Sequence, residues 1–215
     1  MDSRSIAIDI ELREPAAATE FGLPWNGIYE RMMTNADNTE ERNDIAASLK
    51  GDGEAYRRLV VKHQHLIAGQ MRRFSRDPVV LEELVQEVFV EAYLSLKSFR
   101  GKVPFLHWLR RLATRTGYRY WKMQTRCRER ETALPGNLPE LPAEPGTLTC
   151  SEAGEMLFHL LARLNPADRL VLTLFYFDDC ETQEIADRTG WSLAAVKVRL
   201  HRARNRLREL FIHHK

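Results

Sequence analysis

ETQEIADRTGWSLAAVKVRLHRARNRLREL, residues 181–210, reads as two helices separated by Gly190. Glycine commonly ends one helix, and Ser192, two residues later, is a suitable N-cap for the next. In the second helix, apolar residues recur at spacings of three and four, which predicts a single buried stripe. That stripe consists of Val196, Leu200, Ala203 and Leu207. The stretch therefore predicts a helix-turn-helix whose second helix packs through a narrow seam.

The rest of that second helix carries small, polar and cationic side chains. Small residues at its start permit close approach to a DNA major groove, polar residues reach base edges, and flanking cations meet phosphates. The candidate DNA contacts are Ser192, Ala195, Lys197, Val198, Arg199, His201, Arg202, Arg204 and Arg206. A solvated basic face would give a similar charge pattern, but the helix–glycine–helix spacing favours DNA binding.

Charge is distributed unevenly along the chain. The 215 residues carry a formal net charge of only +2, and 44% of them are apolar, which is enough for packed cores. The first 54 residues lean acidic, whereas residues 107–130 and the C-terminal stretch are basic. This asymmetry indicates two separate contacts with anionic partners.

Several classes of function are not supported by the sequence. Three cysteines without a CxxC spacing indicate reduced thiols rather than a disulfide framework or a zinc site. His63 with His65 and His213 with His214 lack a third ligand at a useful spacing, so we expect no metal. We also expect no cofactor and no catalysis, because P-loop, GxSxG and paired-acid motifs are missing. No apolar run reaches the ~18 residues of a membrane span, and the acidic N-terminus is unlike a signal peptide, which predicts a cytoplasmic protein without membrane insertion.

Breaks in helical periodicity divide the chain. Helical patterns begin at Asp52, at Asp77-Pro78 and at Pro104, the last continuing to about residue 128. Four prolines and two glycines follow within residues 132–149, where a helix cannot continue. We therefore expect an all-α fold of two small helical domains joined by a flexible Pro-rich linker. The predicted segments are an N-terminal extension at 1–47, a first domain at 48–130, an acidic linker at 131–152 and a second domain at 153–215.

The N-terminal extension shows no sustained periodicity. Its composition and its two prolines favour disorder, with one short helix near residues 28–33. The residues alone give it no function.

FRGKVPFLHWLRRLATRTGYRYWKMQTRCRER, residues 99–130, mixes cations with aromatic side chains. Cations attract a phosphate backbone, and flat aromatic rings can stack on unpaired bases at about 1–3 kcal/mol each. Trp108, next to Leu109 and Leu112, also fits a core position. Tyr118, Tyr120 and Trp121 span too wide an arc of the helix for all three to be buried. The segment therefore predicts contact with single-stranded nucleic acid through at least one of them.

The C-terminal residues carry a resemblance to a known family. LNPADRLVLTLFYFDDCETQEIADRTGWSLAAVKVRLHRARNRLREL, residues 164–210, resembles the promoter −35-binding domain of sigma-70-family RNA polymerase sigma factors, above all the extracytoplasmic-function (ECF) group. The resemblance rests on Glu184-Ile185-Ala186, on Val196-Lys197 and on residues 199–204. Ala194-Ala195 stand where the family often has Gly-Thr. The resemblance implies that the candidate DNA contacts above recognise a −35 element.

The N-terminal helices resemble the −10-binding domain of the same family. The similar stretches are GDGEAYRRLVVKHQHLI at 51–67, LEELVQEVFVEAYLSLKSFRG at 81–101 and FLHWLRRLA at 105–113. The resemblance implies that this domain melts the −10 element and holds a flipped base. The implied −10 contacts are Phe99, Arg100, Lys102, Phe105, Trp108, Arg111, Arg115, Arg119, Tyr120 and Lys122. Arg115 and Arg119 replace the Asn and Asp common in the family, which implies stronger phosphate binding.

The family also implies a polymerase contact. Its LVQEVF-type helix grips a coiled coil of the largest polymerase subunit. Carried over, Glu83, Gln86 and Glu87 are the contact candidates, with Leu84 and Phe89 as packing support. An acidic helix can dock on a basic partner surface, although the residues alone also fit a solvated helix face. The linker in the family runs through the polymerase cleft; a plain spacer fits this composition equally well.

Taken together, these features predict an ECF-type sigma factor and not an enzyme. Its implied partners are core RNA polymerase, through the largest-subunit coiled coil and the flap region, promoter DNA, and an anti-sigma factor. Two alternatives share part of the pattern. A helix-turn-helix transcriptional activator of another type would share the C-terminal helices but would not replace a housekeeping sigma factor. An RNA-processing enzyme would use the basic helix to hold RNA and would cut it with a divalent metal.

Overall fold

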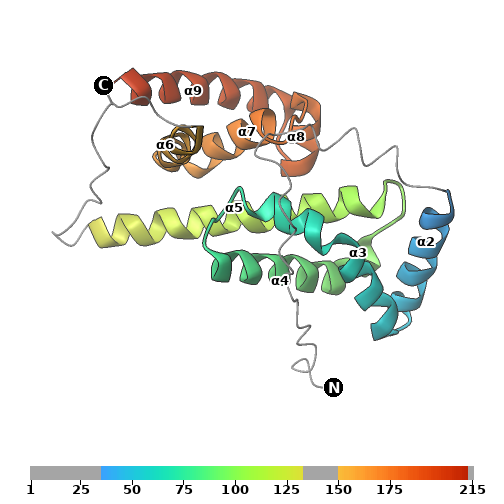
Figure 1. Ribbon diagram of the computed structural model, residues 1–215. Helices are drawn as coiled ribbons and strands as arrows, with labels where there is room; N and C mark the ends of the chain where they lie inside the picture. The colour runs from blue at the N-terminus through green and yellow to red at the C-terminus, as the bar shows by residue number, and fades with distance from the viewer. Residues whose placement is uncertain (1–34, 133–149, 213–215) are drawn as a thin grey trace. The chain divides into compact units, whose positions relative to one another are not determined.

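A computed structural model describes residues 35–132 and 150–212, and the regular elements in these ranges are helices. Figure 1 shows them in chain order. They are α2 (Asn35–Leu49), α3 (Gly53–Met71), α4 (Pro78–Ser95), the 3-10 helix η1 (Leu96–Ser98), α5 (Phe105–Thr132), α6 (Cys150–Ala162), α7 (Pro166–Tyr176), α8 (Thr182–Thr189) and α9 (Leu193–Ile212). The all-α prediction is confirmed. The short helix expected near residues 28–33 and the linker between 133 and 149 lie outside the described residues.

The chain divides into two compact units, and the boundary between them along the chain falls within α5, between Gly117 and Tyr118. The predicted segment boundaries near 47, 130 and 152 remain predictions. Among the described residues, no helix has the length and apolarity needed to cross a membrane.

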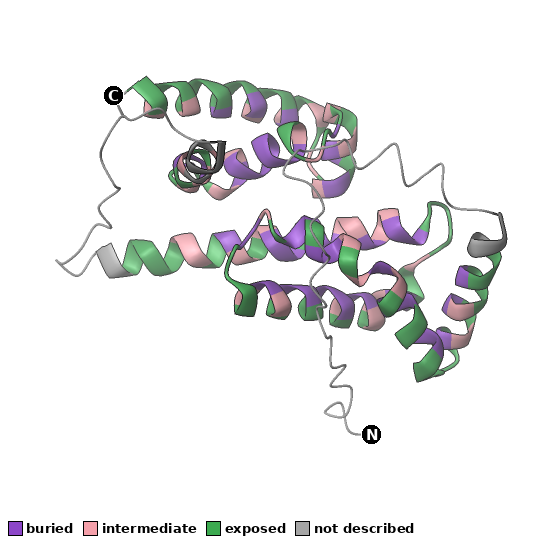
Figure 2. Cartoon of the chain, in the orientation of Figure 1, coloured by how far each residue is buried: buried purple, intermediate pink, exposed green. Residues whose placement is uncertain are grey.

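The first unit is organised around three helices, α3, α4 and the first half of α5. Their inner faces carry the buried residues, as Figure 2 shows. The buried residues of α4 recur at spacings of three and four: Leu81, Leu84, Val85, Val88 and Ala92, followed by Leu96 in η1. Buried hydrogen bonds also join the helices. For example, Gln70 Nε2 of α3 donates to Thr114 Oγ1 of α5 at 3.0 Å. Hydrophobic burial with a few satisfied polar links thus holds this unit together.

Local sequence rules set the helix starts in this unit. Asp52 accepts hydrogen bonds from the backbone N–H groups of Glu54 and Ala55 at the start of α3. Asp77 does the same for Val79 and Val80 at the start of α4. Pro78 occupies the first turn of α4, where its missing N–H costs nothing. The predicted start at Asp77-Pro78 is confirmed.

A glycine in the middle of α5 marks a close approach of two elements. A Cβ at Gly117 would lie 2.4 Å from ring atoms of Phe74, which is 3% exposed in the turn after α3. No real Cβ sits that close to a ring, so only glycine fits this position without a shift of Phe74.

The second unit contains the end of α5 and helices α6 to α9. Its core is formed by Leu160 and Leu161 of α6, the buried residues of α7, Ile185 of α8, and Val196, Leu200 and Ala203 of α9. Asn165 caps α7 through the Asp168 N–H at 2.9 Å, with Pro166 in the first turn. These residues enclose the seam that the sequence predicted for α9.

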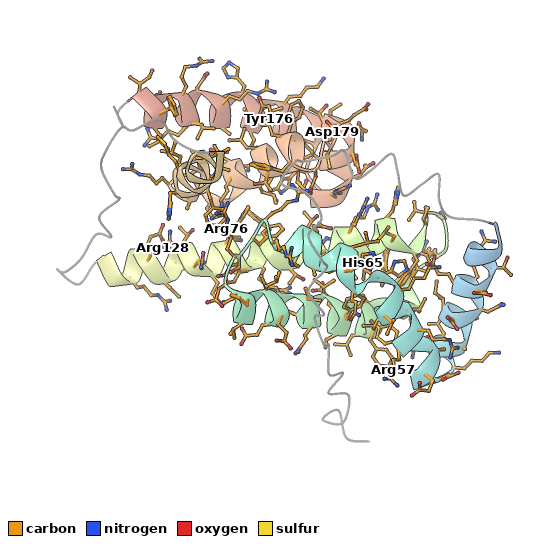
Figure 3. The ribbon with its side chains drawn as sticks, viewed as in Figure 1. Arg57, His65, Arg76, Arg128, Tyr176 and Asp179 are labelled. Atoms are coloured by element: carbon orange, nitrogen blue, oxygen red, sulfur yellow. The ribbon has the colours of Figure 1, made fainter. Side chains whose placement is uncertain are left out.

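A buried arginine ties α8 to the loop before it. The Arg188 side chain is 7% exposed and lies 3.7 Å from Asp178 Oδ2, with a second ion pair to Glu184 one turn earlier on α8. Burial disfavours the charged guanidinium, but the neighbouring anionic groups outweigh it and raise the pKa of Arg188. The loop also contains Asp179, which has a positive φ of 50°. Figure 3 labels it beside the end of α7.

A second buried arginine of this unit belongs to α7. The Arg169 guanidinium of α7 is 3.9 Å from the ring centroid of Trp121 and 5.0 Å from that of Phe158. Burial lowers the pKa of Arg169 to about 10. Trp121 itself is 2% exposed, so it is part of the core. Of the three aromatic residues expected to span a wide arc, Tyr118 and Tyr120 remain half-buried.

Helix α2 was not expected from the sequence, which gave residues 35–47 no regular element. Among residues 39–49, whose burial the structure describes, the buried ones are Glu41, Ile45 and Ser48, so two of these three inward positions are polar. A polar inward face leaves no apolar stripe to detect. The helix is instead fixed by ion pairs to α3, among them Asp44 Oδ1 with Arg58 Nε at 3.0 Å.

Candidate nucleic-acid interface

The helix-turn-helix has the local geometry that the sequence predicted. Gly190 ends α8 in the left-handed region with φ 76°, and its N–H donates to the Ala186 carbonyl. Ser192 Oγ accepts from the Ala195 N–H at 3.2 Å, which satisfies one of the free donors at the start of α9. Val196, Leu200 and Ala203 are at most 5% exposed. The seam therefore fixes which side of α9 faces outward.

The outward side of α9 is polar and uncrowded. Lys197, Val198, His201, Arg202 and Asn205 are exposed, and Val198 keeps 49% of its surface accessible. Within residues 150–212, neither Lys197 nor Arg202 forms an ion pair. These side chains can therefore reach a partner without breaking a contact within the unit.

Three other predicted contacts on α9 are already engaged. The Arg199 guanidinium stacks 4.7 Å from the Trp191 ring centroid. Arg204 Nε donates to Tyr176 Oη at 2.9 Å, and its guanidinium lies 4.9 Å from the Phe175 centroid. Arg206 pairs with Glu209 at 3.1 Å. Tyr176, labelled in Figure 3 at the end of α7, belongs to a different helix from the arginine it holds. Arg204 thus also anchors α9 to α7.

The first unit carries an aromatic cluster, Phe99, Phe105 and Trp108, at the start of α5. Ring centroids are 5.5 Å apart for Phe99–Phe105, 5.3 Å for Phe99–Trp108 and 5.5 Å for Phe105–Trp108. Phe105 is 2% exposed and lies in the core, whereas Phe99 and Trp108 are half-buried. The two outer rings can meet a base, and Phe105 supports them from below.

Cations surround the cluster. Arg100 and Lys102 are exposed in the loop after η1, where Gly101 has a φ of 66°. Along α5, Arg111, Arg115 and Arg119 recur at spacings of four, which places them on one helix face. Tyr120 accepts from Gln124 Nε2 at 2.6 Å, and Lys122 is exposed. The helix thus carries a row of positive charge that starts beside the aromatic cluster.

The outer face of α4 combines acidic and apolar side chains. Glu83, Gln86 and Glu87 are exposed, and Leu84 and Phe89 are 3% exposed and pack inward, as expected for packing support. Val90 and Leu94, which the sequence analysis did not single out, are 55% and 76% exposed. Their spacing from Glu83 and Glu87 places them on the same face, so helical periodicity could have found them.

Both parts of the chain match known protein families. Residues 59–127 match the family model described as sigma-70 region 2, and residues 154–207 match sigma-70, region 4. The ECF RNA polymerase sigma-E factor of Escherichia coli strain K12 is 32% identical over 164 residues, which are 72% of this chain and 85% of that relative. The chain belongs to the ECF group of the sigma-70 family. Sigma factors of this family are regulatory DNA-binding proteins that direct promoter-specific transcription initiation.

Further relatives agree with this assignment. The ECF RNA polymerase sigma-E factor of Haemophilus influenzae is 28% identical over 165 residues, 72% of this sigma factor and 86% of the relative. Two solved structures share the fold, each with a TM-score of 0.51. CnrH in complex with the cytosolic domain of CnrY is 23% identical and covers 81% of this chain and 98% of its own. RpoE of Bartonella quintana in complex with the anti-sigma factor NepR is 20% identical, with 73% and 96% covered.

The family regions correspond to the surfaces described above. Region 2 contains the outer face of α4, the aromatic cluster and the row of arginines on α5. Region 4 contains α7, α8 and most of α9. Helix α2 lies outside both matched segments.

Proposed function

We propose that this sigma factor binds core RNA polymerase through α4, recognises a −35 element with α9, and opens the −10 element with the aromatic cluster and α5. The observation that carries the −35 assignment is the outward face of α9. Its exposed side chains stand opposite a sealed apolar seam and directly after a capped helix start. A helix can enter a major groove only if one of its faces does not pack against the rest of the protein.

At the −35 element, the exposed side chains of α9 would have different roles. Val198 and His201 are short enough to approach base edges, and Lys197 and Arg202 are free to meet phosphates. Arg204 would contact a phosphate only from its position against Tyr176, so it would orient α9 as well as bind. Phosphate neutralisation would make affinity fall steeply with salt.

At the −10 element, the half-buried rings of Phe99 and Trp108 would stack on bases released from the duplex. Each stacked base contributes about 1–3 kcal/mol, which offsets the cost of unstacking. Arg111 and Arg115 on α5 would hold the backbone of the same strand. Because Arg115 and Arg119 add cations where acceptor side chains are common, they would contribute affinity rather than base selectivity.

Core polymerase would bind the outer face of α4. Glu83 and Glu87 supply charge that can steer a basic coiled coil, and Val90 and Leu94 supply exposed apolar area to bury against it. Region 4 would contact the flap region of the polymerase. An anti-sigma factor would act by covering one of these surfaces. A protein that works with core polymerase and promoter DNA would be cytoplasmic.

In-vitro transcription tests the proposal. The purified chain is added to core polymerase on a pool of genomic fragments, and transcript starts are mapped by sequencing. We expect starts downstream of paired −35 and −10 elements. If the chain binds DNA but never directs core enzyme to begin a transcript, the helix-turn-helix activator alternative is favoured. RNA cleavage by the chain with divalent metal would favour the processing enzyme instead.

A charge reversal separates the polymerase contact from general folding. Glu83→Lys should weaken binding to core polymerase, measured by fluorescence anisotropy, while leaving the melting temperature unchanged. The matched control is Glu54→Lys, which makes the same charge change at an exposed position of α3. Equal affinities for the two variants would contradict the α4 assignment.

A further inference from the structure

Helix α2 lies outside the region 2 match but contacts two elements that support the aromatic cluster. It packs on α3 and on η1. Helix η1 ends at Ser98, and the next residue, Phe99, donates its N–H to the Leu96 carbonyl at 3.0 Å. The loop that carries the first ring of the cluster therefore starts from a turn that α2 covers.

A buried polar pair makes the second link. Glu41 of α2 and His63 of α3 are 5% and 2% exposed, and Glu41 Oε1 lies 2.8 Å from His63 Nε2. Lys62 Nζ lies 3.3 Å from the same oxygen. A buried carboxylate without such partners would be strongly unfavourable. Although burial acts to raise the pKa of Glu41, the His63 hydrogen bond and the charges of His63 and Lys62 lower it.

His63 connects Glu41 to the aromatic cluster. Its ring centroid is 5.6 Å from that of Phe105, the buried ring beneath Phe99 and Trp108. Within the described residues, His63 Nδ1 has no hydrogen-bond partner. The imidazole is therefore oriented by its contact with Glu41 through Nε2 and by the packing of the side chains around it.

We propose that Glu41 is a positioning residue for promoter opening, which acts through His63 and Phe105 to hold Phe99 and Trp108 in place for unpaired bases. This inference rests on the proposed function of the aromatic cluster. Without the Glu41 side chain, the imidazole of His63 can rotate. Phe105, which packs on this imidazole, would then hold the rings of Phe99 and Trp108 less firmly. The polymerase surface on α4 and the outward face of α9 have no part in this path.

The test compares Glu41→Ala with Asp44→Ala in the full-length chain. Asp44 is the matched control, because it also joins α2 to α3, through Arg58, but at the surface and away from the rings. Opening is followed by 2-aminopurine fluorescence at the −10 element with holoenzyme assembled on a promoter mapped for the wild type. Core affinity, −35 duplex affinity and melting temperature are measured on the same preparations.

We expect Glu41→Ala to slow opening by about tenfold, which corresponds to ~1.4 kcal/mol and to a weakened ring–base stack. Core and −35 affinities should stay within about twofold of the wild type, a difference of under ~0.5 kcal/mol. Asp44→Ala should open the promoter like the wild type. Glu41→Gln, whose amide oxygen can still accept from Nε2–H, should restore most of the opening rate. If Glu41→Ala melts below the assay temperature, Glu41→Asp replaces it, because it keeps the charge but shortens its reach.

Four results would overturn the proposal. Three concern the opening rate: normal opening by Glu41→Ala, an equal loss in Asp44→Ala, or a loss in Glu41→Gln as large as in Glu41→Ala. The fourth is a loss of core affinity in parallel with opening, since that is what general unfolding produces. Failure of the proposed function looks different, because the wild-type holoenzyme would then open no promoter.

Discussion

Replacing Arg188 with methionine should destabilise the second unit and leave the first unit unchanged. Methionine keeps most of the volume of the arginine but removes its charge and its hydrogen bonds. The Arg188 side chain is 7% exposed and the Asp178 side chain 9%, so both charges lie away from water. The substitution therefore leaves the Asp178 carboxylate buried without this cation.

The size of the effect follows from the burial of each pair. Removing one partner of a buried ion pair costs about 3–5 kcal/mol. Glu184 is 37% exposed, so its pair with Arg188 adds only about 0.3–0.5 kcal/mol. We expect a total loss of about 3–5.5 kcal/mol. For a unit of this size, that loss lowers the melting temperature by roughly 12–45 °C.

Hydrogen exchange followed by mass spectrometry can measure this loss in the full-length chain. Peptides from α8 and α9 should lose protection, whereas peptides from α3 and α4 provide an internal reference. The control variant is Arg206→Met, which removes a comparable ion pair at the surface, with side chains 63% and 57% exposed. It should change stability by under ~1 kcal/mol.

Equal losses of unfolding free energy in Arg188→Met and Arg206→Met would show that the buried ion pair stabilises the unit no more than a surface one. A second check is the double variant Arg188→Met with Asp178→Asn. Because the neutral amide removes the buried negative charge, this variant should recover at least ~1 kcal/mol relative to Arg188→Met alone. No recovery would mean that the loss comes from packing and not from the buried carboxylate.

Three further outcomes are expected. Lys197→Ala and Arg202→Ala should each weaken binding to a −35 duplex and reduce the slope of log K against log salt by about 0.9, measured by anisotropy across salt concentrations; an unchanged slope would show that the side chain meets no phosphate. Gly117→Ala should lower the unfolding free energy of the first unit in denaturant by about 1–2 kcal/mol, because the clash with Phe74 outweighs the ~1 kcal/mol gain in helix propensity; a more stable variant would contradict the clash. The pKa of Glu41 is lowered from its ordinary value of 4.5, so its contribution to stability is present above pH 4.5 and is lost as the pH falls through the folded pKa. The difference in unfolding free energy between the wild type and Glu41→Gln should therefore shrink in acid, and a constant difference would argue against an ionised Glu41.

Features set by neighbouring residues could be predicted from the sequence. The start of α4 at Asp77-Pro78, the turn at Gly190 and the cap at Ser192 each depend on a few consecutive positions. The seam of α9 follows from its period alone. These features needed no knowledge of the tertiary fold. The structure confirms the helix start, the turn, the cap and the seam at Val196, Leu200 and Ala203, whereas Leu207, also expected in the seam, is only half-buried.

Contacts between distant positions could not be predicted in this way. Arg204 looked like a free cation, but its aromatic partners come from α7, some 28 residues earlier in the chain. The buried pair of Glu41 and His63 places charge where an apolar residue would reveal the inward face of α2. Phe105 was expected at a nucleic-acid surface and lies beneath it in the core, because neither its type nor its spacing distinguishes the two positions.

The seam of α9 also has a consequence for how such a regulator can change its targets. Val198, His201 and Asn205 are exposed and lie outside the buried seam, so we expect that their identities can change without loss of the fold. Arg204 cannot drift in the same way, because it fastens the helix to Tyr176. A lineage carrying duplicate copies of this chain could therefore acquire a new set of promoters by changing a few outward side chains while inheriting the scaffold intact.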